Sequence, residues 1–390
     1  MMMVYLDYAA TTPMAAEVIQ VYEEIATTYY GNANSLHTKG TNASNVLTSA
    51  IHTLRHTIKE IETSVHLTRS GTEANQHALN ELLKINHYQG HILTCRTEHP
   101  SLRQHLEHLV QIHPGLRIED VPADGQGQVH PFEVEKRLRS DTILATFAHV
   151  QHEIGTIRDI TAIGNVLAQA KVPFHSDCVQ SYGKIPIPVK ESGLKAISTA
   201  AHKIHGPKAL GAVFFPTSVQ ATDEIPTGTI DVASIAAFAA AAEIQFKKSE
   251  EAITHIRELR AKMIERLPSH FRILGEQQCS PYILGLLLPG IEGQEAMLAC
   301  DRQGIAIATG SACRSGDHEP SETLLALGNT PDTARTFIRL SFGKDTSMTD
   351  IEQTAACLRN IRDDIPTVKR RTANAKSKKI KRGGTSPTDT

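Results

Sequence analysis

Short apolar runs alternate with helical stretches along the first two thirds of the chain, and this alternation restricts the fold more than any other feature. The runs are typical of buried strands, and the segments between them have helical apolar periodicity. Strands separated by helices predict an α/β fold with a mostly parallel sheet covered by helices on both faces. The clearest predicted strands lie at 65–68, 91–95, 116–121, 142–147 and 212–215.

A long predicted helix, at about 234–267, follows these strands and leads to a second group of strands and helices. At 390 residues the chain is too long for one small core, so we expect two domains. The prediction is a large domain at 15–250, a smaller α+β domain formed by 1–14 and 251–366, and a tail at 367–390.

Composition excludes several classes of protein. Hydrophobic residues make up 40% and charged residues 21% of the chain, as in soluble globular proteins. The sequence has no run of eighteen apolar residues and no signal-peptide pattern, so we expect a cytoplasmic protein without a membrane partner. Six cysteines without a CxxC pair argue against a disulfide framework or a metal site.

The tail at 367–390 differs from the rest of the chain in charge. It contains eight Lys or Arg residues and one Asp, and almost nothing apolar, so we expect it to be disordered. Contact with RNA or an acidic partner and simple solvation both suit such a tail. Solvation is the interpretation we favour, and nucleic acid is not an expected partner.

Polar residues follow several of the predicted strands at the point where each strand ends. They are His99, His149, His152, Asp177 and the loop 198–203. Open α/β sheets bind ligands beyond the carboxyl ends of their strands. The sequence therefore predicts a binding site where these residues converge.

Asp177 and Lys203 are the pair within this group that suggests a particular chemistry. A lysine can form a Schiff base with an aldehyde cofactor, and an aspartate can keep a ring nitrogen protonated. On their own, the two residues would be interpreted in favour of the alternative, a helix-capping aspartate and a surface lysine.

The segment 69–75 reads as a strand, a turn of small residues and a helix start. Free backbone N–H groups at such a start bind phosphate, and Gly71 and Thr72 allow an anion to approach closely. An ordinary helix cap, with Ser70 or Thr72 as the N-cap residue, is the alternative.

Two further residues lie in the predicted smaller domain. Cys313 stands in a loop of small residues, 308–316, whose composition favours an accessible thiol over a buried one, although single free cysteines are more often buried. Arg339 stands in an apolar strand and needs an anion, which is either a structural carboxylate or the carboxylate of a substrate.

Ten short motifs in order along the chain resemble those of the cysteine desulfurases of the NifS/IscS type, in the class-V aminotransferase branch of fold type I enzymes. The resemblance spans Tyr5 to about Ile361. Its motifs are YLDYAATTP, GNANSLH, SGTEAN, TEHPS, EIGT, HSDCVQS, AHKIHGPK, TGSAC, EPS and IRLSFG.

This resemblance implies pyridoxal 5'-phosphate (PLP) as cofactor and a role for each matching residue. Lys203 would form the Schiff base, Asp177 would pair with the ring nitrogen, and Cys313 would receive the sulfur. The other residues implied are Gln180 at the ring hydroxyl, His99 and His152 beside the ring, Gly71, Thr72, His202 and, across a homodimer, Thr229 at the phosphate, and Asn32, Asn34 and Arg339 at the substrate carboxylate.

The implied reaction converts L-cysteine to L-alanine and leaves a persulfide on Cys313, with His99 able to take the thiol proton. The persulfide then passes to a sulfur-acceptor protein, either an iron–sulfur scaffold or a cluster enzyme. HSDCVQ, GIEGQ and GIAIATGSAC most resemble a bacterial branch that supplies quinolinate synthase.

Three departures from the family pattern keep other functions open. His152 replaces an asparagine, Ala200 replaces a hydroxyl residue, and the segment 216–226 is short and lacks the usual glycines and arginine. A different PLP reaction, such as that of a selenocysteine lyase or an aminotransferase, is one alternative. A non-catalytic binding subunit that has lost the cofactor is the other.

Overall fold

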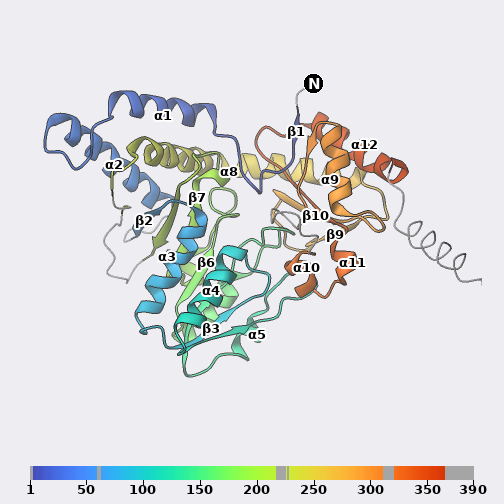
Figure 1. Cartoon of the computed structure of the whole chain (residues 1–390), viewed down its shortest axis with the longest axis horizontal. Helices are drawn as coiled ribbons and strands as arrows, with labels where there is room; N and C mark the ends of the chain where they lie inside the picture. Colours follow the sequence, from blue (N-terminus) through green and yellow to red (C-terminus); the bar gives the residue numbers. More distant parts are fainter. Residues whose placement is uncertain (1–2, 59–62, 217–224, 226–227, 311–319, 365–390) are drawn as a thin grey trace, which may run out of the picture.

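The computed structural model describes residues 3–58, 63–216, 225, 228–310 and 320–364. In Figure 1 these residues form two lobes, a larger one built on a seven-stranded sheet and a smaller one that contains the C-terminal helices. Residues 311–319, which include Cys313, lie outside the described part of the chain. So do residues 365–390, which include the predicted basic tail.

The seven-stranded sheet has the order β2-β8-β7-β6-β5-β3-β4. Its strands β3 to β7 pair in parallel, whereas β8 is antiparallel to both of its neighbours, β2 and β7. Only ten residues join β7 to β8, which is too short for the crossover that a parallel pair needs. The strands are β2 (Ser64–Thr68), β3 (Gly90–Thr94), β4 (Leu116–Asp120), β5 (Thr142–Thr146), β6 (Phe174–Asp177), β7 (Ala196–Ala200) and β8 (Gly211–Phe215).

Helices cover both faces of this sheet, which confirms the predicted α/β architecture. Successive strand residues point to opposite faces, so Leu93 and Ala145 join one apolar core while Ile92 and Leu144 join the other. The helices of this lobe are α1 (Ala16–Thr28), α2 (Thr38–Thr57), α3 (Gly71–Lys84), α4 (Pro100–Ile112), α5 (Pro131–Glu135), α6 (Ile160–Gln169), α7 (Val189–Ser192) and the 3-10 turn η1 (Ala201–Lys203).

The smaller lobe has its own core and two small sheets. An antiparallel sheet has the order β12-β10-β9, and β1 pairs in parallel with β11. The elements are β1 (Val4–Tyr5), β9 (Arg272–Leu274), β10 (Ile283–Leu287), α9 (Gly293–Arg302), β11 (Ile305–Ala306), α10 (Glu322–Ala326), α11 (Pro331–Ala334), β12 (Phe337–Ser341) and α12 (Met348–Asp364).

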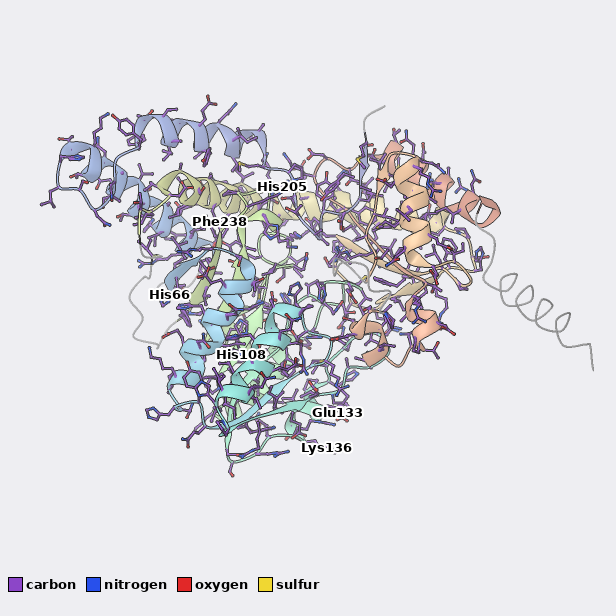
Figure 2. All side chains as sticks on the ribbon, viewed as in Figure 1. His66, His108, Glu133, Lys136, His205 and Phe238 are labelled. Atoms are coloured by element: carbon purple, nitrogen blue, oxygen red, sulfur yellow. The ribbon has the colours of Figure 1, made fainter. Side chains whose placement is uncertain are left out.

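Helix α8 (Val232–Arg266) joins the two lobes, as the length of the predicted helix suggested. Its first part packs in the large core, where Figure 2 labels Phe238, and its later residues Ile256 and Met263 pack in the small core. His205 lies near the junction of the lobes in the same view. The domain boundaries at 15 and 251 stay a prediction.

Local capping explains where one helix departs from its predicted bounds. Helix α2 was expected from about residue 44 but begins at Thr38, because His37 is extended and its ring accepts a hydrogen bond from the Gly40 N–H at 3.2 Å. Among the described residues, no helix combines the length and the apolar character needed to span a bilayer.

Candidate active site

Most of the polar residues predicted at the strand ends converge on one pocket, whereas His149 is not among its lining residues. The pocket has a volume of about 260 Å³ and lies beyond the carboxyl ends of β2, β3, β5, β6 and β7. Its lining includes eight residues that were predicted from the sequence: Gly71, Thr72, His99, His152, Asp177, Gln180, His202 and Lys203.

Asp177 ends β6 and is held by two donors. Its Oδ2 accepts from Asn75 Nδ2 at 2.8 Å, and its Oδ1 accepts from the Val179 backbone N–H at 2.9 Å. Asn75 is buried on α3, and no hydrogen-bond partner is found for its own Oδ1 among the described residues. The carboxylate is therefore fixed in orientation at the pocket wall, beside an amide oxygen that is free to accept another hydrogen bond.

A fully buried histidine lies behind Asp177 in the sheet. His175 Nδ1 is 2.8 Å from Thr146 Oγ1, and its Nε2 is 2.8 Å from Ser198 Oγ. Burial lowers the pKa of His175 to about 4, so its ring is neutral at physiological pH. The two hydroxyls connect the ends of three neighbouring strands, which makes the floor of the pocket rigid.

The start of helix α3 provides the other end of the pocket. Ser70 is the N-cap, and its Oγ accepts from the Glu73 N–H at 3.0 Å, so the capping alternative is correct for this residue. Gly71 lies so close to the β7 end that an added Cβ would come within 3.1 Å of the Ala200 Cβ. Ser70 can cap the helix while the helix start also binds a phosphate, because an N-cap side chain satisfies only one of the free N–H groups there.

His99 is the N-cap of α4, and its contacts decide where its proton resides. Its Nδ1 accepts from the Ser101 backbone N–H at 3.1 Å and is 2.8 Å from Ser101 Oγ. Neutral His99 therefore carries its proton on Nε2. Burial lowers the pKa of His99, and the ring of His152 packs edge-on against it with centroids 4.9 Å apart.

Lys203 lies in η1, directly after β7, and its amine is held by main-chain carbonyls. Its Nζ donates to the carbonyl oxygens of Ala9 at 2.5 Å and Ala10 at 2.7 Å. Burial, followed by the charge of Arg339, lowers the pKa of Lys203 to about 8. A substantial fraction of the amine is therefore neutral in mildly alkaline solution.

Gln180 follows β6 and has a single possible amide orientation. Its Nε2 donates to the Ala9 carbonyl at 2.9 Å, and its Oε1 accepts from Lys184 Nζ at 3.2 Å. A carbonyl can only accept and an ammonium can only donate, so both neighbours require the same orientation. The NH₂ group thus faces the Ala9 side of the pocket.

Arg339 pairs with a carboxylate of the protein, which is one of the two alternatives left open by the sequence. Its Nη2 is 3.0 Å from Asp7 Oδ1, and its Nη1 donates to the His152 carbonyl at 2.8 Å. The Nε atom is buried, and the described part of the chain offers it no hydrogen-bond partner. The guanidinium is therefore only partly satisfied by the protein itself.

A buried ion pair holds the loops that carry the two pocket histidines. Arg158 Nη1 bonds Glu98 Oε1, and both side chains are fully buried. Arg158 also donates to Thr97 Oγ1 at 2.6 Å, while Glu98 Oε2 accepts from the Ala148 N–H at 2.8 Å. The pair thus connects the segments that follow β3 and β5.

Four predicted site residues that the structure describes are not among those that line the pocket of this single chain: Asn32, Asn34, Thr229 and Arg339. Asn32 and Asn34 lie in the exposed connection between α1 and α2, where Asn32 Oδ1 accepts from the Asn34 N–H at 3.0 Å. Thr229 is exposed just before α8. Cys313 lies outside the described residues, and Cys178 and Cys300 are buried.

Sequence reasoning missed four residues that the structure brings to this region. Asn75 belongs to the quoted SGTEAN motif and lies one helical turn after Gly71, a spacing that could have identified it. The other three carry no local signal: two of them pair with residues distant in the sequence, and the third, whose hydrogen-bond partner Gln180 is four positions away, is buried by the packing of distant elements. They are Asp7, Arg158 and Lys184.

Comparison with known proteins gives consistent matches over most of the chain. The profile of the aminotransferase class-V family matches residues 4–354. The NifS protein of Bacillus subtilis (strain 168) is 35% identical over 369 residues, which are 90% of this chain and 92% of that protein. The cysteine desulfurase IscS of Dictyoglomus turgidum is 30% identical over 379 residues, 94% of this chain and 96% of that protein. The solved structure of a NifS-like protein is similar with a TM-score of 0.85 and 25% identity, and the match covers 93% of this chain and 100% of that one.

Proposed function

The chain belongs to the class-V aminotransferase family and is a cysteine desulfurase, and we propose that the pocket between Lys203 and Asp177 holds PLP for this reaction. The observation that carries the proposal is the convergence, in one pocket, of an amine with a lowered pKa, an oriented carboxylate and a helix N-terminus. These three groups match the aldehyde, the basic ring nitrogen and the phosphate of the cofactor.

The residues present fit this cofactor at each of its polar groups. Asp177 is oriented by Asn75 and Val179 and would accept a hydrogen bond from the protonated ring nitrogen. Gly71 leaves room for a phosphate near the free N–H groups of α3, since a side chain there would contact Ala200. Gln180 would donate to the ring hydroxyl, because its amide orientation presents NH₂ on the Ala9 side.

The cofactor, when bound, supplies a ring that withdraws electrons from the substrate Cα. The chain supplies the proton transfers, and Lys203 is the proposed base. Its lowered pKa allows the neutral amine to accept the Cα proton on Nζ near pH 8. The neutral ring of His99 would cover the cofactor and donate from Nε2.

Sulfur transfer is assigned to Cys313. Its thiolate would attack the sulfur of L-cysteine, so that the S–Cβ bond breaks and L-alanine and a Cys313 persulfide are formed. The Nδ1 atom of His99 already accepts hydrogen bonds from the backbone N–H and the hydroxyl of Ser101, and its Nε2 carries the ring proton. His99 could therefore take the thiol proton only if the hydrogen bonds from Ser101 broke. Arg339, with its unpartnered Nε, would help to hold the substrate carboxylate.

The proposed assembly is a homodimer. Asn32, Asn34 and Thr229 are exposed in the single chain, which suits residues that act at a partner subunit's pocket. The proposed acceptor of the persulfide is an iron–sulfur scaffold or a cluster enzyme, with quinolinate synthase as the candidate that the subgroup motifs favour.

A spectrum of the purified protein with PLP, recorded before and after L-cysteine and combined with alanine measurement, tests this function. We expect a visible cofactor band that changes on addition of L-cysteine, and equimolar sulfur and alanine. Cys313→Ser should keep the band and lose the persulfide, whereas Cys279→Ser, at a half-exposed cysteine, should retain both. Absence of a cofactor band after addition of PLP would favour a non-catalytic subunit, and unchanged sulfur release by Cys313→Ser would refute the assigned mechanism.

A further inference from the structure

A second pocket lies on the other side of Lys203, between the lobes. It has a volume of about 300 Å³ and is bounded by the segment Tyr8–Thr12, the middle of α8 and the residues after β12. Lys203 lines both this pocket and the cofactor pocket. Among the described residues, Lys203 is the one member of the proposed desulfurase site that lines this space.

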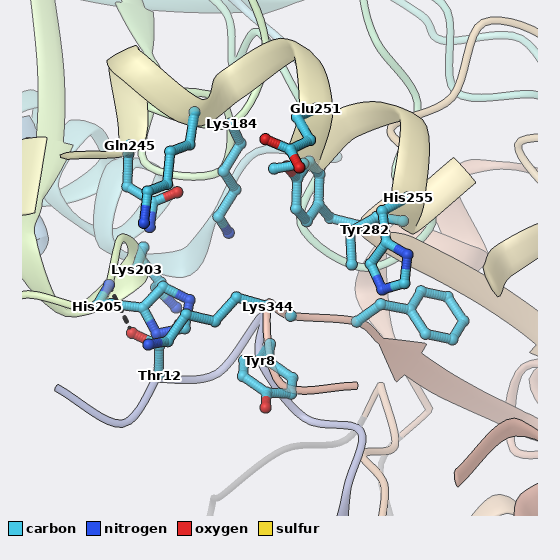
Figure 3. A pocket seen from close by; sticks show the side chains of 15 residues that line it. Tyr8, Thr12, Lys184, Lys203, His205, Gln245, Glu251, His255, Tyr282 and Lys344 are labelled. Carbon is cyan, nitrogen blue, oxygen red and sulfur yellow. Dashed lines mark hydrogen bonds between the residues drawn. The ribbon is translucent and has the colours of Figure 1, made fainter. Parts of the chain in front are cut away.

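The side chains around this second pocket carry more positive than negative charges. Lys184, Lys248 and Lys344 line it together with Lys203, whereas Glu251 is the carboxylate among its lining residues. In Figure 3, Lys184 and Lys344 extend into the pocket from opposite sides. Lys248 lies 3.9 Å from Glu17 and Lys344 lies 3.9 Å from Asp345, distances at which exposed pairs compensate charge weakly.

Lys184 is the least compensated of these amines. It is 7% exposed, and the acceptor found for its Nζ among the described residues is the neutral Gln180 oxygen at 3.2 Å. The ring centroid of Tyr282 is 5.8 Å away. A buried ammonium normally has a carboxylate or several hydrogen-bond acceptors around it.

Apolar and aromatic side chains form much of the remaining wall of the second pocket, beside the polar Thr12, His205, Gln245 and His255. Tyr8, Tyr282 and Phe342 are all less than 9% exposed, and Ile256 packs beside them. A cationic centre within apolar walls favours an anion that carries an apolar body over a fully hydrated inorganic ion. The chemistry that fits is a small carboxylate attached to a flat or branched apolar group.

We propose that the pocket between Lys184 and Lys344 is a second ligand site that binds a small organic carboxylate and thereby keeps Lys184 protonated. The inference goes beyond the desulfurase reaction, and its binding test does not depend on turnover. Because Lys203 borders the site, the occupant would also add a negative charge close to the proposed catalytic base.

The charge of Lys184 should control the affinity of this site. Burial, followed by the charges of Lys203 and Arg339, lowers the pKa of Lys184 to about 7. An anion binds the protonated form better, so its affinity should fall as the pH rises through 7. The charged and titratable groups that face Lys184 from the surrounding elements are Tyr8, Lys203, His205, Lys248, Glu251, His255, Tyr282, Arg339 and Lys344.

Benzoate is a suitable probe, and titration calorimetry of the PLP-loaded enzyme is the measurement. Benzoate stays ionised between pH 6 and 8, whereas a group with a pKa of about 7 loses most of its proton over this range. We therefore expect about tenfold weaker binding at pH 8 than at pH 6. Benzyl alcohol, which has the ring but no charge, should bind at least about tenfold more weakly than benzoate at pH 6.

Variants locate the site and identify the group that titrates. Lys184→Met should weaken benzoate binding and abolish its pH dependence, while Lys344→Met should weaken binding but keep the pH dependence. His255→Gln should keep the pH dependence, which separates the amine from an imidazole in the same pocket. Lys247→Met, on the exposed side of α8, should change neither property, since Lys247 pairs with Glu243 in solvent.

The proposal is overturned if Lys184→Met and Lys344→Met both bind benzoate like the unmodified enzyme. It is also overturned if benzyl alcohol binds as tightly as benzoate, or if His99→Ala, which alters only the cofactor pocket, removes the binding. If Lys184→Met loses its helical circular dichroism signal, the variant has not folded and the Lys344→Met result alone tests the proposal. The Lys344 side chain is 39% exposed, so its replacement should not affect folding. Any of these results leaves the assignment of the desulfurase reaction untouched.

Discussion

Replacing Arg158 by methionine should destabilise the protein in a way that depends on pH. Arg158 and Glu98 are both fully buried, so the substitution leaves a carboxyl group in the interior without its cation. A carboxylate in that position costs about 3 to 5 kcal/mol. Protonation of Glu98 limits this cost, because the neutral acid is far less expensive to bury.

The limit can be calculated from the pH. A glutamate carboxyl group has a pKa of about 4.3 in the unfolded chain, and keeping it protonated costs about 1.4 kcal/mol for each pH unit above that value. The cost is therefore about 3.7 kcal/mol at pH 7 and about 1.6 kcal/mol at pH 5.5. In the variant, the folded pKa of Glu98 lies above its unfolded value, so stability is lost as the pH rises. Burial raises the pKa of Glu98 already in the unmodified protein, where Arg158 opposes this shift, so part of the pH dependence is common to both proteins. Relative to the unmodified protein, Arg158→Met should therefore be less destabilised at pH 5.5 than at pH 7 by at most about 2 kcal/mol.

Urea titrations followed by circular dichroism at the two pH values measure this difference. Arg117→Met is the matched control, because Arg117 bonds Asp141 with side chains 58% and 40% exposed, and such pairs contribute below about 1 kcal/mol. An equal loss at both pH values, or a loss at pH 7 no larger than that of the control, would refute the account of Glu98 as a buried carboxylate that depends on Arg158.

Three further results are expected at the cofactor pocket. Asn75→Ala removes a donor from Asp177 and should weaken PLP binding by about 10-fold or more in titrations of the apoenzyme, with unchanged circular dichroism; unaltered affinity would contradict the role of Asn75. Gly71→Ala should reduce PLP affinity because its Cβ would contact the end of β7, whereas Gly125→Ala, which faces open space, should not. The kcat should rise with pH towards a plateau above about 8, as Lys203 loses its proton, and a kcat independent of pH between 7 and 9 would argue against Lys203 as the base.

The parts of the site that were predictable from the sequence are those that follow strands. Asp177, His99 and Lys203 each come directly after an apolar run, and a parallel sheet brings the ends of its strands to one edge. Position in the chain therefore predicts position in space for these residues. The same reasoning predicted the helix start at Gly71, because a turn of small residues between a strand and a helix has few other conformations.

The residues that sequence reasoning missed depend on contacts between distant segments. Arg158 and Glu98 are separated by 60 positions, and Arg339 and Asp7 by 332. An arginine or lysine in a polar stretch is normally exposed, and only the packing of several elements reveals that it is buried. Lys184 is an example, since its burial arises where the turn after β6 meets α8 and the smaller lobe.

The short segment after β1 explains why the geometry at Lys203 depends on both lobes. β1 pairs with β11 in the smaller lobe, and Asp7 bonds Arg339 of β12. Two residues later, the Ala9 carbonyl accepts from both Lys203 and Gln180 in the larger lobe. A displacement of the smaller lobe would therefore move the acceptor that fixes the amine of Lys203 and, through the same oxygen, the amide of Gln180. Because one carbonyl serves both donors, the proposed base and the proposed ligand of the ring hydroxyl must respond together to any change in how the lobes meet.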